Sequence, residues 1–446
     1  MFLRKTHRIK HTCRSFRWIG PLIMGLGYFY LSRQADLRLA FPQLVLTSAL
    51  EVAILGAIWY GLSKKYFGLT ALEVIFWAFI FRVFFVSDIP QLSDDLYRYL
   101  WDGARVAAGE NPYDLPPAAF VDSVKGPMAE TLARTNHPHL VTIYPPGAQV
   151  LFALAWKLFP GLVGLKSLLT LLDLVTCFFL TKLAPRPGVA IAYAWHPLAV
   201  LEVSSSGHLE AALGLFVILT LYFLKRKQFF RAGLCEGMAI MVKIVPLIFL
   251  PFFLKAPKRL FNSGLSPKAG LPQVAFGAGV GLIIFLLLLP FLGHLSHLFG
   301  TLKIYTLQWE FSGFLYEILK ALWGKTEARV VLLLSFLSLG FLIYQKNFPL
   351  EKSLYLVALA FLLTTPTLHP WYVLLFLIFL PLNFRPEGLL LGWVAFLPYY
   401  VLRDYALFGL WQENHFMTAI LFVVSLICFL SGFKYSGRKK AKGETP

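Results

Sequence analysis

Long apolar segments without charges recur along the chain and are separated by short polar loops. A segment such as "VAFGAGVGLIIFLLLLPFL" is long enough to cross a hydrocarbon core of about 30 Å as a helix. No stretch alternates apolar and polar residues with the period of two that a membrane β-barrel requires. The pattern therefore predicts an all-α polytopic membrane protein.

The apolar segments predict roughly twelve transmembrane helices, with both termini in the cytoplasm. Spans are expected near residues 18–32, 43–62, 69–87, 188–203, 208–224, 272–292, 328–345, 350–366, 371–384, 387–402 and 416–433. Residues 147–180 make one further net crossing, which we interpret as a short interfacial or re-entrant helix before Pro160 and then a full span. The first apolar run is interpreted as a membrane helix and not as a signal peptide, because no small-residue cleavage site follows it.

One apolar segment, "AGLCEGMAIMVKIVPLIFLPFFL", lies between two basic loops. A single crossing would put one of these loops on the wrong side of the membrane under the positive-inside rule. We therefore predict a re-entrant hairpin that enters and leaves on the cytoplasmic face and is broken at Lys243 and Pro246.

Residues 88–146 are the longest polar segment, and acidic side chains outnumber basic ones in it. The order of the spans predicts that this segment is a large extracytoplasmic loop. We expect one integral membrane domain over residues 1–446, with no separate soluble domain. The lack of a clear internal repeat argues against the two-halved architecture of many transporters.

The composition agrees with this interpretation, since 58% of the 446 residues are apolar, against about 45–50% in soluble domains. The formal net charge of +18 does not indicate a nucleic-acid partner, because lysine and arginine are concentrated in the tails and short loops. The four cysteines are scattered and predict no disulfide or metal framework. Nucleotide-binding and HExxH motifs are absent from the sequence, so a nucleotide-fuelled pump has no support.

The segment "SDDLYRYLWDGARVAAGENPYD" in the outer loop carries the densest group of charges. Asp95, Arg98, Asp102 and Arg105 have the spacing of one helix face, which predicts an amphipathic interfacial helix. Asp94 and Asp95 begin this helix, and Gly109 suits its end.

Two interpretations of these charges remain open. In the first, Asp94 caps the helix and the other charges form exposed intrahelical pairs, each worth a few tenths of a kcal/mol. In the second, Asp94 or Asp95 deprotonates a hydroxyl group, or the two hold a divalent cation such as Mg or Mn. Neighbouring residues on a helix point about 100° apart, which is awkward for two ligands of one ion.

Other candidates lie at the ends of membrane segments. His208 and Glu210 follow "SSSG", and ionisable groups inside a membrane protein are costly and tend to be functional. The same argument applies with less force to Lys166, Asp173 and Lys243.

The segment "TLHPWY" ends one span and begins the next. Trp371 and Tyr372 suit the interfacial aromatic belt. His369, and Arg403 in "LRDY", could instead donate to a phosphate. Tyr144 in "TIYPPGAQ" lies where the chain re-enters the membrane.

Several of these motifs occur in an order that resembles the GT-C superfamily of membrane glycosyltransferases. The similarity is greatest to bacterial mannosyltransferase-related proteins and to the GPI mannosyltransferase I branch. It covers about residues 90 to 375 and rests on "SDDLYRYLWDGARVAAGENPYD", "YPPGAQVLFAL", "GLKSLLTLLDLV", "WHPLAVLEVSSSGHLEAALG", "KIVPLIFLPFF" and "HPWYVLL".

The resemblance implies an inverting transferase that moves a sugar, with mannose favoured, from a polyprenyl-phosphate carrier to an acceptor hydroxyl on a glycan, lipid or protein. It implies an extracytoplasmic site in a multi-pass protein, with the bacterial inner membrane favoured. The family's catalytic carboxylate matches Asp94 or Asp95. The sequence departs from many relatives in that the two acids are adjacent and in that His-Leu-Glu replaces His-Asn-Asp, which leaves the role of Glu210 open.

We therefore predict that Asp94 or Asp95 is the general base. The sequence itself requires no cofactor, and the question of a divalent cation, Mg or Mn, stays open. The predicted substrate-binding residues are Arg98, Asp102, Tyr144, His208, Glu210, His369, Trp371, Tyr372 and Arg403. The alternatives are a transporter or flippase of a lipid-linked saccharide and a noncatalytic partner in an envelope complex.

Overall fold

The computed structural model of the protein describes residues 2–260 and 270–434. Within these ranges the backbone is helical without β-strands, apart from isolated bridges that pair Phe311 and Ser312 with Thr367. The predicted all-α class is therefore confirmed. Part of the basic loop and the basic tail that contributed to the cytoplasmic assignment lie outside the described residues.

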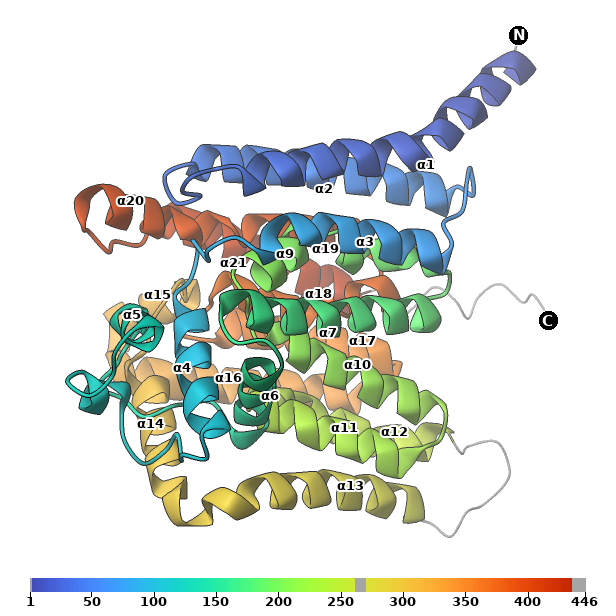
Figure 1. The fold of residues 1–446 in the computed structure, drawn as a ribbon. Coiled ribbons are helices and arrows are strands. Elements are labelled where there is room, and N and C mark those ends of the chain that lie inside the picture. The colour runs from blue at the N-terminus through green and yellow to red at the C-terminus, as the bar shows by residue number, and fades with distance from the viewer. Residues whose placement is uncertain (1, 261–269, 435–446) are drawn as a thin grey trace.

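Long helices lie side by side in stacked layers (Figure 1). At one edge, α1 (Phe2–Ser32), α2 (Phe41–Ser63) and α3 (Ala71–Val86) run back and forth. The bounds of α2 and α3 are close to the predicted ranges, whereas α1 begins well before the predicted start near residue 18. The other α-helices are α4 (Asp95–Ala107), α5 (Pro127–Arg134), α6 (Pro146–Leu158), α7 (Leu162–Leu183), α8 (Ile191–Ala194), α9 (Pro197–Val200), α10 (Glu210–Lys225), α11 (Phe229–Val242), α12 (Leu250–Leu260), α13 (Leu271–Leu288), α14 (Leu295–Gln308), α15 (Phe314–Trp323), α16 (Lys325–Gln345), α17 (Leu350–Thr364), α18 (Leu374–Leu377), α19 (Pro386–Val394), α20 (Tyr400–Phe408) and α21 (His415–Lys434). Short segments between them are the 3-10 helices η1 (Pro117–Phe120), η2 (Pro187–Ala190), η4 (Val245–Phe249), η5 (Leu289–His294), η6 (Pro370–Val373), η7 (Leu380–Leu382) and η8 (Leu397–Tyr399) and the π-helix η3 (Leu201–Ser205).

Five helical segments within the described ranges are long and apolar enough to cross a membrane. They are Phe41–Ser63, Leu162–Leu183, Leu271–Gln308, Lys325–Gln345 and His415–Lys434. The other expected spans are shorter or broken, apart from the one within the long helix α1, so the total of roughly twelve crossings stays a prediction.

Three segments expected as continuous helices are broken at prolines. Residues 188–203 form η2, α8, α9 and η3 in place of one helix, with Pro197 starting α9. Residues 371–384 are interrupted at Pro381, and residues 387–402 at Pro398. Proline lacks an amide donor and clashes with the preceding turn of a helix, which explains these breaks. The apolar pattern alone did not predict them. Broken helices are tolerated at membrane depth where other elements bury them.

The predicted hairpin is present between α11 and α12. The helix α11 ends at Val242, and Lys243 follows with an extended backbone. Pro246 lies in η4, after which α12 runs back toward the end of the molecule at which α11 begins (Figure 1). The backbone break thus holds Lys243 inside the helix bundle.

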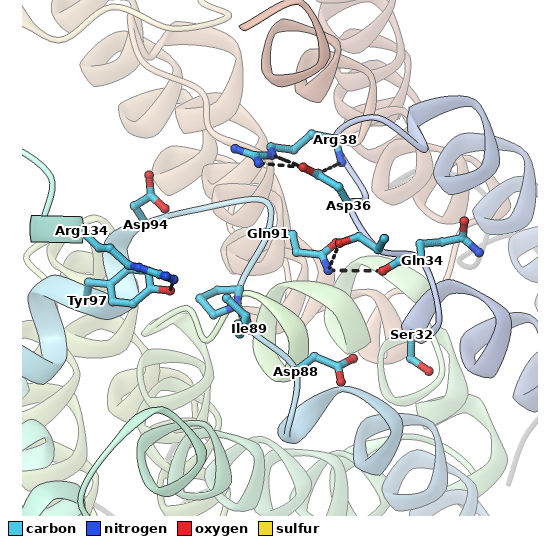
Figure 2. Close-up of a pocket in the computed structure, with 12 residues that line it drawn as sticks. Ser32, Gln34, Asp36, Arg38, Asp88, Ile89, Gln91, Asp94, Tyr97 and Arg134 are labelled. Atoms are coloured by element: carbon cyan, nitrogen blue, oxygen red, sulfur yellow. Dashed lines mark hydrogen bonds and ion pairs between the residues drawn. The ribbon is translucent and has the colours of Figure 1, made fainter. Parts of the chain in front are cut away.

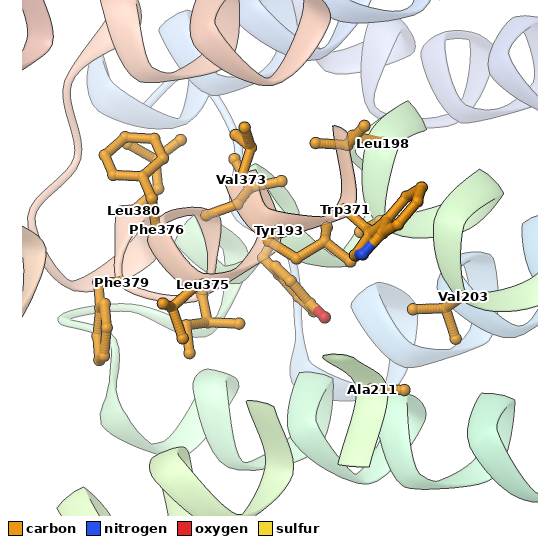
Figure 3. Close-up of a cluster of buried hydrophobic side chains, with 14 of the residues drawn as sticks. Tyr193, Leu198, Val203, Ala211, Trp371, Val373, Leu375, Phe376, Phe379 and Leu380 are labelled. Carbon is orange, nitrogen blue, oxygen red and sulfur yellow. The ribbon is translucent and has the colours of Figure 1, made fainter. Parts of the chain in front are cut away.

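The centre of the bundle is filled by two of the broken segments. Tyr193 and Leu198 from the first segment pack near Val373 and Phe376 from the second, and all four are buried (Figure 3). Because the first segment leads directly to His208 and the second begins with Trp371, this packing fixes the relative positions of candidate site residues.

A buried ion pair joins α3 to α7. Arg82 donates to Asp173 at 2.7 Å, and the Tyr193 hydroxyl donates to the same carboxylate. Both charged side chains are fully buried. Removing one partner would leave an uncompensated charge in an apolar interior, so this pair has a structural role.

Lys166 determines where the outer loop leaves the bundle. Its ammonium group donates to the backbone oxygens of Phe85 and Asp88, at 2.7 and 2.6 Å. These carbonyls belong to the end of α3, where helical partners run out. Lys166 therefore fixes the start of the segment that leads to Asp94.

Candidate active site

The helix α4 is packed into the protein and does not lie along its surface. Its residues from Leu96 to Gly103 are buried, mainly against α6. A Cβ atom at Gly103 would lie 2.6 Å from the backbone oxygen of Phe152, so only glycine permits this approach. The helix ends at Ala107, and Gly109 has a positive φ of 86°, as its predicted role at the helix end requires.

Arg98 and Asp102 form a buried ion pair, so the expectation of exposed intrahelical pairs is wrong for these two residues. Arg98 Nε donates to Asp102 at 3.0 Å, and Nη1 donates to the backbone oxygen of Leu140 at 3.0 Å. Gln149 of α6 donates to the other oxygen of Asp102 at 3.2 Å. Arg98 and Asp102 thus hold α4 in position. Arg105 pairs instead with Glu110, near the end of the helix.

Asp94 and Asp95 point in different directions. Asp94 lines a hollow next to Arg38 and Arg134 and makes no capping hydrogen bond (Figure 2). The predicted cap is therefore wrong. Asp95, at the first turn of α4, instead faces His208 across the bundle. The divergence of the two carboxylates argues against a cation held by both.

Asp95 has a polar environment made by elements distant in sequence. Its Oδ1 accepts a hydrogen bond from Asn136 at 2.8 Å, and its Oδ2 lies 3.9 Å from His208 Nδ1. Burial raises the pKa of Asp95, while the Asn136 hydrogen bond and the charge of Lys243 lower it, with burial the larger effect. Tyr144 also lies close enough to favour the charged carboxylate. The side chain keeps 21% exposure, so a substrate can reach it.

His208 is held by the segment that precedes it. After the π-helix η3, Gly207 adopts a φ of 75°, a conformation that L side chains rarely adopt. His208 Nε2 lies 3.3 Å from Glu202, which accepts a hydrogen bond from Tyr399 at 2.8 Å. Glu202 was not predicted as a site residue, because its carboxylate meets His208 only through the π-helical turn.

Four flat rings form a continuous stack at the site. His208 stacks on Trp371 with ring centroids 3.9 Å apart, and Trp371 stacks on His369 at 4.3 Å. Phe311 covers the other face of His369 at 4.8 Å. Trp371 is 8% exposed and Tyr372 is 9% exposed, so the alternative that places them in a lipid-facing aromatic belt is wrong.

Lys243 joins the hairpin to the site. Its ammonium group pairs with Glu210 at 2.5 Å and lies 4.5 Å from the ring centroid of Tyr372. The Tyr372 hydroxyl shares a hydrogen bond of 2.6 Å with Tyr305. Glu210 thus has a defined partner. The sequence signal that identifies Lys243 is its position as a lysine at the break of a membrane hairpin.

Most of the predicted site residues meet at one place. Asp95, Tyr144, His208, Glu210, His369, Trp371 and Tyr372 converge, together with Asn136, Glu202, Lys243 and Tyr305. Arg403 instead donates to Tyr400 at 3.2 Å and contacts none of the converging residues in the described structure.

No group of three or more histidine, cysteine, aspartate or glutamate side chains within the described ranges is arranged to hold a metal ion.

Comparison with known proteins identifies the family. Residues 3–258 match the family model described as alpha-(1->6)-mannopyranosyltransferase, N-terminal domain, which is more than half of the chain. The chain belongs to this mannosyltransferase family. Residues 203–321 also match the mannosyltransferase (PIG-M) family. No curated protein and no solved structure matches the chain.

Both matches are to mannosyltransferases, so the protein is a membrane glycosyltransferase that transfers mannose. This confirms the predicted resemblance and favours an enzyme over a transporter or an assembly partner. Both matched ranges include His208, Glu210 and Lys243. The mannosyltransferase families therefore cover the centre of the candidate site.

Two ion pairs of α4 predict different effects on stability. Asp102→Ala strands a buried arginine and is expected to lower the free energy of unfolding by about 3–5 kcal/mol. Glu110→Ala removes the exposed partner of Arg105 and is expected to cost at most about 1 kcal/mol. Denaturant unfolding in detergent, followed by circular dichroism, measures both. Equal effects would contradict the buried role of Asp102.

Proposed function

We propose that this mannosyltransferase takes mannose from a polyprenyl-phosphate donor and transfers it, with inversion, to an acceptor hydroxyl, with Asp95 as the general base. The observation that carries the proposal is the meeting of Asp95, His208 and Lys243 at one site. A carboxylate and a cation on facing elements are what this reaction needs.

The reaction assigns one role to each side of the site. Asp95 accepts the proton of the acceptor hydroxyl while the oxygen of that hydroxyl bonds to C1 of mannose. The C1–O bond to the phosphate breaks, and the phosphate leaves with the electron pair. Attack opposite the leaving group inverts C1.

Lys243 and the histidines His208 and His369 supply the phosphate side of the site. Lys243 is a cation within the bundle, and an ion pair with a buried carboxylate holds it in place. Charge that develops on the leaving phosphate is stabilised most strongly by such preorganised groups. The ring stack of His208, Trp371 and His369 offers a flat wall for the sugar or the lipid. This assignment replaces Arg98 and Arg403, whose described contacts lie elsewhere.

We propose that the site faces the extracytoplasmic side of a bacterial inner membrane. The start of α1 and the end of α12 lie at one end of the molecule, and α4, α5 and α20 lie at the other (Figure 1). The basic segments belong to the first end, in keeping with the positive-inside rule. In this arrangement residues 1–446 are one membrane domain, and residues 88–146 are its large outer loop.

Asp95→Asn tests the base. The amide cannot accept the proton, so kcat is expected to fall by roughly 10²–10⁴-fold. Purified protein in lipid vesicles would receive polyprenyl-phosphate mannose and an α-mannoside acceptor, and release of polyprenyl phosphate would be followed by mass spectrometry. Asp122→Asn is the matched control, because Asp122 is an exposed aspartate of the same loop.

Full activity of Asp95→Asn would contradict the assignment of Asp95 as the general base. Loss of activity in Asp94→Asn alone would move the base to Asp94. Activity with a nucleotide sugar and none with the polyprenyl-phosphate donor would overturn the proposed donor.

The pH dependence gives an independent test of Asp95. Its carboxylate must be deprotonated to act, and its pKa is raised above the usual value by burial. Activity should therefore be present at high pH and fall as the pH drops through a value above about 3.9. Asn136→Ala removes a hydrogen bond that lowers the pKa, so it should move this acid limb to higher pH. An acid limb that Asn136→Ala leaves in place would count against Asp95.

Lys243→Met tests the phosphate side. Removing the cation is expected to lower kcat by about 10²–10³-fold. The double variant Lys243→Met with Glu210→Gln also removes the stranded carboxylate. If Lys243 stabilises the phosphate, the double variant stays inactive; recovery of activity would show that Lys243 only neutralises Glu210. Lys303→Met, at an exposed position of α14, is the control.

A further inference from the structure

The two ring nitrogens of His208 face two different carboxylates. Glu202 Oε2 lies 3.3 Å from His208 Nε2, and Asp95 Oδ2 lies 3.9 Å from His208 Nδ1. The side chain of Glu202 is fully buried, whereas that of Asp95 is partly exposed. The imidazole therefore lies between one carboxylate that a substrate can reach and one that a substrate cannot reach.

The backbone holds Glu202 and His208 together and brings them to α4. The His208 amide donates to the backbone oxygen of Glu202 at 2.9 Å, directly after the π-helix η3. Gly207 precedes His208, and a Cβ atom at Gly207 would lie 2.7 Å from the Leu96 side chain. Leu96 follows Asp95 on α4. This turn thus places the imidazole against the start of the helix that carries Asp95.

The ring of His208 is also held on its flat face. Trp371 stacks on it with ring centroids 3.9 Å apart. Trp371 belongs to the same buried cluster as Val203 of η3 (Figure 3). Because this packing restricts rotation of the ring, each nitrogen keeps its own carboxylate.

Glu202 has few groups that can donate to it. Its Oε1 accepts from the Tyr399 hydroxyl at 2.8 Å. Its Oε2 is buried, and no hydrogen bond joins it to a described residue, although Ser206 lies close to the carboxylate. A buried carboxylate without a donor is costly. The Nε2 proton of His208 is the donor that the ion-pair contact brings to Oε2.

Asp95 depends less on a proton from His208. It accepts from Asn136 at 2.8 Å, and its side chain is 21% exposed. The proton of a neutral His208 is therefore expected on Nε2, toward Glu202. This arrangement leaves Nδ1 unprotonated and facing Asp95.

We propose that Glu202 is a positioning residue that keeps the Nε2 proton of His208 in place, so that Nδ1 carries the acceptor's proton from Asp95 to the leaving phosphate. Nδ1 takes the proton from Asp95 Oδ2, which restores the carboxylate. The imidazolium then gives this proton to an oxygen of the departing phosphate, so the protein gains and loses no proton over the cycle. The inference rests on the proposed function for the base and the donor.

The chemistry of such a pair is general. A buried carboxylate next to an imidazole fixes the tautomer of the ring and stabilises the imidazolium that forms, while the other nitrogen takes and returns the proton. Lys243 and His369 also face His208, and the charge of Lys243 opposes an imidazolium. The negative charge of Glu202 offsets this effect.

The distances suit a transfer that occurs only with substrate bound. The 3.9 Å between Nδ1 and Asp95 is too long for a hydrogen bond. Catalytic hydrogen bonds are often long in the free enzyme and shorten in the substrate complex.

Glu202→Gln tests the tautomer directly. The glutamine keeps the shape of the side chain, but its amide nitrogen can donate to Nε2 and so favour the proton on Nδ1. ¹⁵N NMR of histidine-labelled protein in lipid nanodiscs distinguishes the two tautomers, and His208→Gln assigns the signal among the ten histidines. We expect wild-type His208 to carry its proton on Nε2 and the Glu202→Gln protein to carry it mainly on Nδ1.

The wrong tautomer should slow turnover without weakening binding. Glu202→Gln is expected to lower kcat by roughly 10²–10⁴-fold, with the KM of donor and acceptor unchanged. Glu51→Gln is the matched control, because Glu51 is a buried glutamate that faces Gly27 of α1, away from the site. It should keep the wild-type kcat. An unchanged thermal melting profile in detergent shows that both variants are folded.

Glu202→Asp separates the charge of Glu202 from its shape. The aspartate is shorter but keeps a carboxylate for Nε2, so it should retain the wild-type tautomer and a higher kcat than Glu202→Gln. A residue that only fills space would show the reverse order, because glutamine matches glutamate more closely in shape.

The other outcomes are equally definite. Full kcat in Glu202→Gln, or loss of kcat with an unchanged tautomer, would overturn the inference. A wild-type His208 with its proton on Nδ1, or with both nitrogens protonated, would also overturn it. Full activity of Asp95→Asn would instead remove the base of the proposed function, while a changed tautomer and a lowered kcat in Glu202→Gln would still support the positioning role of Glu202.

Discussion

A charge inside an apolar helix bundle must have a partner, and this constraint places most of the polar elements of the protein. The free energy of an isolated buried charge is too high for a stable fold, so buried cations of the described residues lie beside a carboxylate or a free carbonyl. Arg82 lies against Asp173, and Lys166 lies against the end of α3. Lys243 meets Glu210 in the same way. These contacts make the bundle rigid where the site is built.

The same constraint distinguishes structural charges from candidate catalytic ones. Arg82 and Asp173 are fully buried, and no substrate could reach them. Lys243 and Asp95 keep 19% and 21% of their side chains exposed, although each has a partner. A charge that is held in place and still accessible can act on a ligand without first being reorganised, which is the condition for electrostatic catalysis.

Much of the fold followed from the sequence, because long apolar helices have a strong pattern. The ends of α2 and α3 and the break at Lys243 agree with hydropathy, loop charge and proline. The breaks at Pro197 and Pro381 were not foreseen, because an apolar run gives no sign of where neighbouring segments satisfy its backbone. The spacing of Arg98 and Asp102 placed them on one face of α4 correctly. It could not show that this face turns inward, because that depends on Gly103 meeting α6.

Charge and position made Asp95 and His208 separate candidates, and only the family resemblance predicted that they and Trp371 belong to one site. Their contacts depend on a π-helical turn and on segments more than a hundred residues apart. A local sequence pattern cannot predict contacts between such distant segments. Choosing between Asp94 and Asp95 likewise required the direction of each side chain. Glu202 and Lys243 are recognised as site residues only from their contacts with His208 and Glu210.

The close contact of Gly103 with α6 has a consequence for how such an enzyme can change over evolution. Asp95 is carried by a helix that cannot shift without a collision, whereas the turn between α1 and α2 is a surface loop. Surface loops tolerate changes in length and sequence that packed helices do not. The sequence of that turn can therefore change while the carboxylate of Asp95 keeps its place in the bundle.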